Sequence, residues 1–203
     1  AHHDNDNGTA AGSAYLFDTT TGAQLAKLFP SDAAAFDYFG NSVAISGNTA
    51  IVGAFGDDDN GLWSGSAYLF DITTGAELAK LLPSDGAIDD QFGSAVAISG
   101  DTAIVGAPRD GDNGFYSGSA YLIDATTGAQ IAKLLPSDGA SDDYFGSAVA
   151  ISGNTAIVGA YGDDDDGNLS GSAYLFDIRT WAEIGKLTLT DDTTPALFGS
   201  SAG

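Results

Sequence analysis

The sequence has no cysteine, only 6 basic residues among 203, two histidines and no long apolar run, and each shortage excludes a class of protein. Without cysteine the chain can form neither disulfides nor thiolate zinc sites, and it has no cysteine nucleophile. No stretch approaches the roughly 18 apolar residues of a membrane helix, so we expect no membrane span. His2 and His3 stand at the start, which leaves the rest of the chain without a histidine base.

The scarcity of lysine and arginine leaves 28 acidic residues against 6 basic ones, a formal net charge of -22. A surface of this sign repels nucleic acid and anionic membranes, so we expect neither as a partner. It favours cations or basic ligands instead. Because 43% of the residues are hydrophobic and only 17% are charged, the composition indicates a folded domain rather than a disordered chain.

One short segment recurs through the whole chain. GSAYLFD begins at Gly12 and returns at Gly65 and Gly171, with GSAYLID at Gly118. The same step of 53 residues separates the FG pairs and the only lysines, which are Phe39, Phe92, Phe145 and Phe198, and Lys27, Lys80, Lys133 and Lys186. A regular repeat of this length indicates an array of one supersecondary unit whose copies pack against one another.

Each unit contains four short segments that we predict to be strands. In the unit 39–91, the segments 42–46 and 49–54 flank the pair Gly47-Asn48, which is typical of a tight hairpin turn. GSAYLFD follows an acidic loop and is apolar at both odd and even positions, as in a strand covered on both faces. The segment 76–82 has helix-favouring residues but is only about two turns long, so we interpret it as an outer strand.

Four antiparallel strands per unit, small residues in the first two and bulky ones in the third predict an all-β fold, a β-propeller of four-stranded antiparallel blades. A parallel β-solenoid is the alternative, although its coils are usually shorter and need no tight hairpins. We expect one propeller domain, 1–203, with whole blades at 39–91, 92–144 and 145–197. The fourth repeat is split and incomplete: 1–38 supplies strands three and four, and 198–203 supplies the start of strand one.

Four units of 53 residues need 212 positions and the chain has 203, so the split blade has no second strand. Three arrangements satisfy this count: a four-bladed disc closed by the chain's own ends, chains that complete one another in a larger propeller or a fibre, and a segment of a seven-bladed array. Unpaired strand edges template pairing. We therefore predict self-association through the incomplete blade, as a homo-oligomer or a filament.

Two motifs resemble the signatures of FG-GAP repeats, the blades of the integrin α-subunit head and of many secreted bacterial proteins: Phe92-Gly93 followed by SAVAIS, and Gly106-Ala107-Pro108. Other copies pair FG with GAF (53–55) and GAY (159–161), and the resemblance, closest to the bacterial arrays, covers essentially the whole chain. It implies a β-propeller, usually seven-bladed, that serves extracellular adhesion or ligand binding rather than catalysis. The integrin-type calcium loop D-x-D-x-D-G between the first and second strands is missing, because those positions hold SGNT or SGDT.

Acidic residues gather in two sets of loops that we place on one face of the blades, and we expect the opposite face to be almost neutral. The first set reads DNDNG, DDDNG, DGDNG and DDDDG, and the second occupies 31–37, 84–90, 137–143 and 190–196. Carboxylates and glycine-freed carbonyls suit the 6 to 8 oxygen ligands of calcium, which makes calcium the candidate cofactor, bridging two loops. A solvated acidic surface is the alternative. The candidate calcium ligands are Asp4, Asp6, Asp57, Asp58, Asp59, Asp110, Asp112, Asp163, Asp164, Asp165 and Asp166.

Aromatic residues follow the first set of loops, and Trp63, Phe115 and Tyr116 are the candidate ligand-binding residues. They vary inside an otherwise constant repeat, which is typical of a surface that recognises a glycan or a protein partner. Packing beneath the loops is the alternative.

Enzyme motifs are missing from the sequence. No GxSxG, HExxH or phosphate-binding loop occurs, and paired aspartates such as Asp89 and Asp90 are repeated, which argues against one specialised catalytic site. We predict that the protein is not an enzyme but a secreted, cell-surface binding or adhesion module that self-associates. The alternatives are a structural subunit of an extracellular filament and a carbohydrate-binding, lectin-like propeller.

Overall fold

The computed structural model describes residues 1–165, 167–189 and 196–202. These residues form strands and no helix, so they contain no helix that could cross a membrane. The strands are β1 (Ala14–Phe17), β2 (Gln24–Leu28), β3 (Val43–Ser46), β4 (Thr49–Ala54), β5 (Ser66–Asp71), β6 (Glu77–Leu81), β7 (Ala95–Ser99), β8 (Thr102–Ala107), β9 (Ser119–Asp124), β10 (Gln130–Leu134), β11 (Phe145–Ser152), β12 (Thr155–Ala160), β13 (Ser172–Asp177) and β14 (Ala182–Leu187).

The strands form antiparallel sheets in which each strand pairs with its neighbours in the sequence. Strands β3 to β6, β7 to β10 and β11 to β14 make three four-stranded sheets, and β1 pairs with β2. The predicted blades of four antiparallel strands are therefore confirmed. The three sheets fall within the predicted blades 39–91, 92–144 and 145–197.

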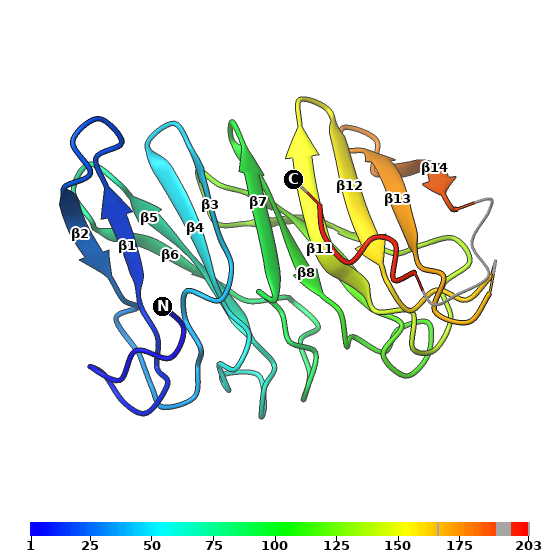
Figure 1. The fold of residues 1–203 in the computed structure, drawn as a ribbon, viewed down its shortest axis with the longest axis horizontal. Coiled ribbons are helices and arrows are strands. Elements are labelled where there is room, and N and C mark those ends of the chain that lie inside the picture. Colours follow the sequence, from blue (N-terminus) through cyan, green and yellow to red (C-terminus); the bar gives the residue numbers. More distant parts are fainter. Residues whose placement is uncertain (166, 190–195, 203) are drawn as a thin grey trace.

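The blades stand side by side in chain order and make an open row (Figure 1). The β1 and β2 pair lies at one end of the row and β11 to β14 lie at the other. In the described residues the two parts of the split repeat are thus not joined, and the row is not the disc closed by its own ends that was one of the three predicted arrangements.

The hairpins and the outer strands form as the residues predict. Ser46 pairs with Thr49, so β3 and β4 are joined by the two residues Gly47 and Asn48, and Gly47 takes a φ of +56°. The segment with helix-favouring residues is the strand β6, which pairs with β5 through Ala67 and Leu81. Backbone pairing explains this outcome, since β6 pairs with the edge of β5 that β4 leaves open.

The hydrophobic cores lie between neighbouring blades. One core joins Ile51 and Leu69 of one blade to Val105 and Tyr121 of the next. Phe92, the aromatic residue of an FG pair, lies fully buried in this core with its ring 5.3 Å from that of Tyr121 in an edge-to-face contact. Each blade is therefore stabilised mainly by its neighbours, as expected for a repeat array.

The glycines of the repeat allow two blades to approach at the backbone. Gly65 has a φ of +81°, and a Cβ atom placed on it would lie 2.1 Å from the carbonyl oxygen of Phe92 in the next FG pair. These two residues form an isolated parallel bridge, and the same bridge recurs at each step of the repeat. A side chain at this position would separate the blades, which is why GS and FG recur together.

The turns on the face opposite the acidic loops carry carboxylates, and one of them carries a tryptophan. The turn after β5 carries Asp71, whose carboxylate accepts hydrogen bonds from the backbone of Thr73 and Thr74, and the turn after β9 carries Asp124. The expectation of an almost neutral face was therefore wrong, because each turn uses one carboxylate to satisfy its own N–H groups. Trp181 replaces a turn glycine and keeps its left-handed backbone, with a φ of +62°.

Candidate functional site

The acidic connections lie at one end of the sheets, which we call the loop face and define by the connections 55–65 and 108–118 and their equivalents. There the central and outer strands of each blade bring a tyrosine and a lysine together. Tyr121 on β9 pairs directly with Lys133 on β10, and Tyr68 on β5 pairs with Lys80 on β6. Directly opposed residues of an antiparallel pair project from the same side of the sheet, so both side chains point to the same loops.

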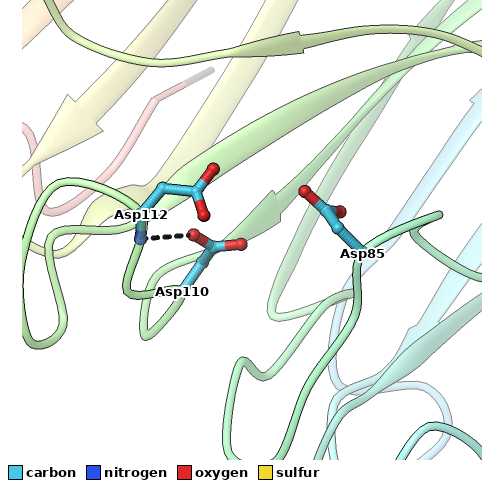
Figure 2. A group of neighbouring side chains, drawn as sticks. All are labelled: Asp85, Asp110 and Asp112. Atoms are coloured by element: carbon cyan, nitrogen blue, oxygen red, sulfur yellow. Dashed lines mark hydrogen bonds between the residues drawn. The ribbon is translucent and has the colours of Figure 1, made fainter.

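The lysine ammonium lies among three carboxylates. Lys133 Nζ is 2.8 Å from Asp110, 2.8 Å from Asp85 and 2.6 Å from Asp112. Asp110 and Asp112 belong to one loop and Asp85 to a separate loop that faces it (Figure 2). Oxygen atoms of these three carboxylates lie within 4.8 Å of one another, close enough to hold one cation.

The tyrosine hydroxyl completes this cluster from beneath. Tyr121 is fully buried, and its hydroxyl lies 2.9 Å from Asp110 and 3.0 Å from Asp85. Asp110 is itself buried and also accepts a hydrogen bond from the backbone N–H of Asp112. The lysine, the tyrosine and the backbone thus give this buried carboxylate the partners that burial requires.

The same arrangement recurs in the other repeats. We call each set of lysine, tyrosine and aspartates a lysine cluster. The clusters of Lys80 and Lys186 also have three aspartates each. The cluster of Lys27 has two aspartates, one of which accepts a hydrogen bond from Ser13. The sets are Lys27 with Tyr15, Asp4 and Asp6; Lys80 with Tyr68, Asp32, Asp57 and Asp59; and Lys186 with Tyr174, Asp138, Asp163 and Asp165.

The charges within a cluster stabilise one another. Burial favours loss of the Lys133 proton, yet hydrogen bonds to Asp110, Asp112 and Asp85 outweigh it and hold the pKa of the ammonium above its ordinary value. Burial raises the pKa of Asp85, but its hydrogen bond to Lys133 brings the net value below the ordinary one. Burial and the neighbouring carboxylates raise the pKa of the Tyr121 hydroxyl. At neutral pH Lys133 is therefore an ammonium, Asp85 is ionised and Tyr121 is a neutral phenol.

The lysine clusters gather most, but not all, of the predicted calcium ligands. Asp4, Asp6, Asp57, Asp59, Asp110, Asp112, Asp163 and Asp165 all contact a lysine. Asp58 instead accepts a hydrogen bond from the backbone N–H of Trp63, and no contact in the described residues ties the Asp164 carboxylate to a lysine. Asp166 and the loop residues 190–195 lie outside the described residues.

Sequence reasoning missed the lysines, the tyrosines and the aspartates of the second set of loops as members of one site. The signal was present in their shared step of 53 residues. The metal position that the family resemblance implies does not fit this chain, because the first and second strands of each blade are joined by only two residues. These turns are Gly47-Asn48, Gly100-Asp101 and Gly153-Asn154, and they hold one carboxylate among them.

A second type of aspartate lies just outside the clusters of Lys80, Lys133 and Lys186. Asp37, Asp90 and Asp143 are buried, and each accepts a hydrogen bond of 2.6 Å from a backbone N–H three residues earlier. Burial is the main cause that raises the pKa of all three carboxyls from 3.8 to about 6, and a neighbouring cluster aspartate adds to it. These raised pKa values contrast with those of the neighbouring Asp57 and Asp163, which are lowered.

The candidate ligand-binding aromatics lie on the loop face. Trp63 is 37% exposed and Phe115 is 65% exposed, while Tyr116 is half-buried. The Tyr116 hydroxyl donates a hydrogen bond of 2.8 Å to Asp89, and the guanidinium of Arg109 lies 5.0 Å from the centre of its ring. Tyr116 is therefore held in place by Asp89 and Arg109, whereas the Phe115 ring is open to solvent.

The rings form a row that crosses from one blade to the next. Tyr38 stacks on Phe55 with their centres 5.0 Å apart, and Phe55 meets Trp63 edge to face at 6.5 Å. In the next blades Tyr144 stacks on Tyr161 at 4.9 Å. These pairs connect adjacent repeats at two blade junctions, whereas the junction between them has Gln91 and Pro108 at the equivalent positions.

Comparison with known proteins identifies the repeat. Residues 23–70, 76–123 and 129–176 each match the family model described as FG-GAP repeat. No curated protein matches the chain.

Solved structures share the fold at low sequence identity. The chain is 17% identical to Kuenenia stuttgartiensis hydrazine synthase, with a TM-score of 0.59 over 90% of this chain and 44% of that one. The computationally designed protein Ika8 is 21% identical, with a TM-score of 0.57 over 88% of this chain and 44% of that one. The designed protein Ika4 is also 21% identical, with a TM-score of 0.54 over 86% of this chain and 82% of that one. The chain thus spans less than half the length of two of these proteins, and the likeness concerns the fold alone.

Proposed function

This chain belongs to the FG-GAP repeat family, and on that premise we propose that it is an extracellular, non-enzymatic module that binds a partner through its loop face. FG-GAP repeats are typical of extracellular proteins, and their propeller fold suits a general binding or structural role. Adhesion at a cell surface is the specific role that we propose. Since one fold hosts many activities, the support must come from the loop face itself.

The observation that carries the proposal is that one backbone geometry holds a different side chain in each repeat, buried at Ala10 and at the surface in the three whole blades. Ala10, Trp63, Tyr116 and Leu169 are separated by 53 residues, and their φ values all lie between +53° and +57°. A left-handed backbone is costly for residues other than glycine, and such strain concentrates at functional sites. Variable side chains on a fixed backbone are what a recognition surface needs.

The chemistry of these side chains indicates what the partner offers. Exposed Trp63 and Phe115 provide apolar ring faces, which stack on sugar rings or on the side chains of a protein. The surrounding carboxylates favour a partner that is neutral or basic, given the net charge of -22. A basic protein segment satisfies both requirements, and a neutral glycan satisfies the first.

The absence of enzyme activity is part of the same proposal. The carboxylates of the lysine clusters are held in ion pairs with Lys27, Lys80, Lys133 and Lys186, which makes them poor proton donors and acceptors. Asp90, whose pKa of about 6 would suit acid-base chemistry, is buried in its loop. A group so enclosed has no path to a substrate.

Tryptophan fluorescence tests the proposed binding surface. The chain has two tryptophans, and Trp181 lies in the turn before β14, away from the loop face. The variant Trp181→Phe therefore reports on Trp63 alone. We expect its emission to shift when the binding partner is added from a panel of basic peptides, matrix proteins and neutral glycans, because a ring that stacks on a ligand loses water.

The matched comparison is between the two tryptophans. Trp63→Ala and Tyr116→Ala should each weaken binding at least about tenfold, as for anchor residues of an interface, whereas Trp181→Ala should leave it unchanged. Equal loss in Trp63→Ala and Trp181→Ala, or no loss in either, would contradict a loop-face binding site.

Self-association is the second candidate function, and the edge of β1 favours it. This strand pairs only with β2 among the described residues, and beside it runs a groove of about 530 Å³ lined by apolar residues such as Leu16, Val43 and Ile45. Exposed apolar strand edges promote pairing between chains. Light scattering should give a mass that is a multiple of 20.4 kDa, and a mass of 20.4 kDa at all concentrations would exclude this role.

The loop face has carboxylates grouped as in a calcium site, but a lysine already lies among them. The oxygens of Asp85, Asp110 and Asp112 lie close enough together to hold one ion. The ammonium of Lys133 contacts all three carboxylates, however, so a calcium ion would have to displace it. Calorimetric titration of the native chain with calcium measures whether it does.

A further inference from the structure

The lysine ammonium takes the position that a divalent cation would need. Calcium binds oxygens at about 2.3 to 2.6 Å, so two of its ligand oxygens lie at most about 4.6 to 5.2 Å apart. The carboxylate oxygens of Asp85, Asp110 and Asp112 lie within 4.8 Å of one another, and Lys133 Nζ lies 2.6 to 2.8 Å from each of these residues. The carboxylates are thus spaced for a metal, but the space between them is filled.

A buried serine beside the cluster supplies a further unused oxygen. Ser119 Oγ is fully buried and has no hydrogen-bond partner in the described part of the chain. In the first repeat the equivalent Ser13 donates a hydrogen bond of 3.0 Å to Asp4, which is the equivalent of Asp110. The position of Ser119 therefore faces the cluster, and its hydroxyl is available as a neutral ligand.

The cluster also joins neighbouring blades, which is a common role of structural metals. Asp85 follows β6 in one blade, whereas Lys133 and Asp110 belong to the next. The Lys133 side chain is only 14% exposed and Asp110 only 4%, so their ion pair is weakly screened by solvent. A single charged group on β10 therefore holds together two loops that would otherwise repel each other.

We propose that Lys133 and its equivalent Lys186 are built-in replacements for a metal ion, so that their clusters join the blades without any divalent cation, and that removing the ammonium alone turns the three carboxylates of the cluster into a divalent-cation site. The loops with the D-x-D-N-G pattern then carry carboxylates that suit a metal ion, and the lysine of the outer strand keeps the ion out. This inference does not depend on the binding function of the aromatic row.

The test compares the native chain with Lys133→Met, which keeps an unbranched side chain and removes the ammonium group. Calorimetry with calcium should show no site at this cluster in the native chain. It should show one additional site in Lys133→Met, at least about tenfold tighter than any calcium binding by the native chain. Terbium luminescence excited through Tyr121 should appear only in the variant, because that ring lies directly beneath the carboxylates.

Two control variants separate a specific site from the general attraction of an acidic protein for cations. Lys133→Arg retains a cation and should stay without the extra site, and the double variant Lys133→Met with Asp112→Asn should lose it again. Magnesium at equal concentration should not compete well, because it demands a smaller octahedral shell.

If Lys133→Met does not fold, thermal melts of the native chain still test the proposal. The native chain should have the same melting temperature in calcium and in a chelator, after correction for the effect of an equal concentration of magnesium. A calcium-specific rise in the melting temperature of the native chain that Asp112→Asn abolishes would overturn the proposal, as would a folded Lys133→Met that gains no calcium or terbium site.

Discussion

Replacing the buried Asp90 by asparagine should stabilise the protein at neutral pH. The carboxyl is 6% exposed and its pKa in the folded protein is raised from 3.8 to about 6. A difference of about two pKa units corresponds to about 3 kcal/mol between its two protonation states. The ionised carboxylate thus costs the folded state about this much above pH 7, and asparagine, which is never ionised, removes that cost.

The sign of the pH dependence follows from the direction of the shift. Because the pKa of Asp90 is higher in the folded than in the unfolded chain, the folded state binds more protons between pH 3.8 and about 6. Its contribution to stability is complete below pH 3.8 and is lost as the pH rises through about 6. Asp57 has a lowered pKa and opposes this trend only as the pH falls below its ordinary value of 3.8.

Urea unfolding from pH 4.5 to 7.5 measures both effects. The native chain should lose unfolding free energy as the pH rises, and Asp90→Asn should be less sensitive to pH by up to about 1.4 kcal/mol per pH unit, the slope for one proton. The asparagine oxygen can still accept the 2.6 Å hydrogen bond from Ala87 N–H. Asp71→Asn, which removes an exposed carboxylate of lowered pKa, is the matched control and should keep the native slope.

The reasoning would be refuted if Asp90→Asn kept the native slope between pH 5 and 7, or if it were less stable than the native chain at pH 7.5. The equivalent residues Asp37 and Asp143 provide independent repetitions, since their pKa values are also raised to about 6. Because the three groups lie in different repeats, the gains of the single variants should add in the triple variant.

Three further substitutions test how the blades hold together. Gly65→Ala should lower the free energy of unfolding by more than about 3 kcal/mol, because its Cβ would lie 2.1 Å from the Phe92 oxygen. Gly100→Ala has a φ of +57° but open space around it, and should lower that free energy by about 1 kcal/mol. Equal losses in urea unfolding would argue against the close backbone contact. Tyr121→Phe should cost about 1 to 3 kcal/mol by thermal melts, because Asp110 loses a buried donor, and an unchanged melting temperature would contradict this. Phe92→Ala should cost about 3 to 5 kcal/mol, since its fully buried ring lies between blades, and a loss below about 1 kcal/mol would mean that the core refills.

The local structure could be predicted from the sequence because neighbouring residues decide it. The glycine of Gly47-Asn48 accepts the left-handed turn, and so the β3 and β4 hairpin was expected and is confirmed. The segment 76–82 was harder, since its side chains favour helix, but its short length indicated a strand. The blade as a unit of four antiparallel strands follows from these segments in order.

The lysine cluster could not be predicted in the same way, because its members come from separate loops and strands. Lys133 lies 23 residues after Asp110 and 48 after Asp85. The step of 53 residues showed that the lysines recur, but not which charges face them. The acidic loops alone indicated a metal site. The lysine ammonium reaches them because β10 pairs with β9, which places Lys133 beside Tyr121.

The sequence by itself determined the repeat, its four strands, its turns and the excess of negative charge, since each depends on residues that are close in the chain or on composition. The tertiary structure decided what those charges contact and that the blades form an open row (Figure 1). The physical reason is that an ion pair depends on distances of about 3 Å between atoms that the backbone brings together from far apart. Whether a row of blades closes depends on small rotations between sheets, which no single repeat encodes.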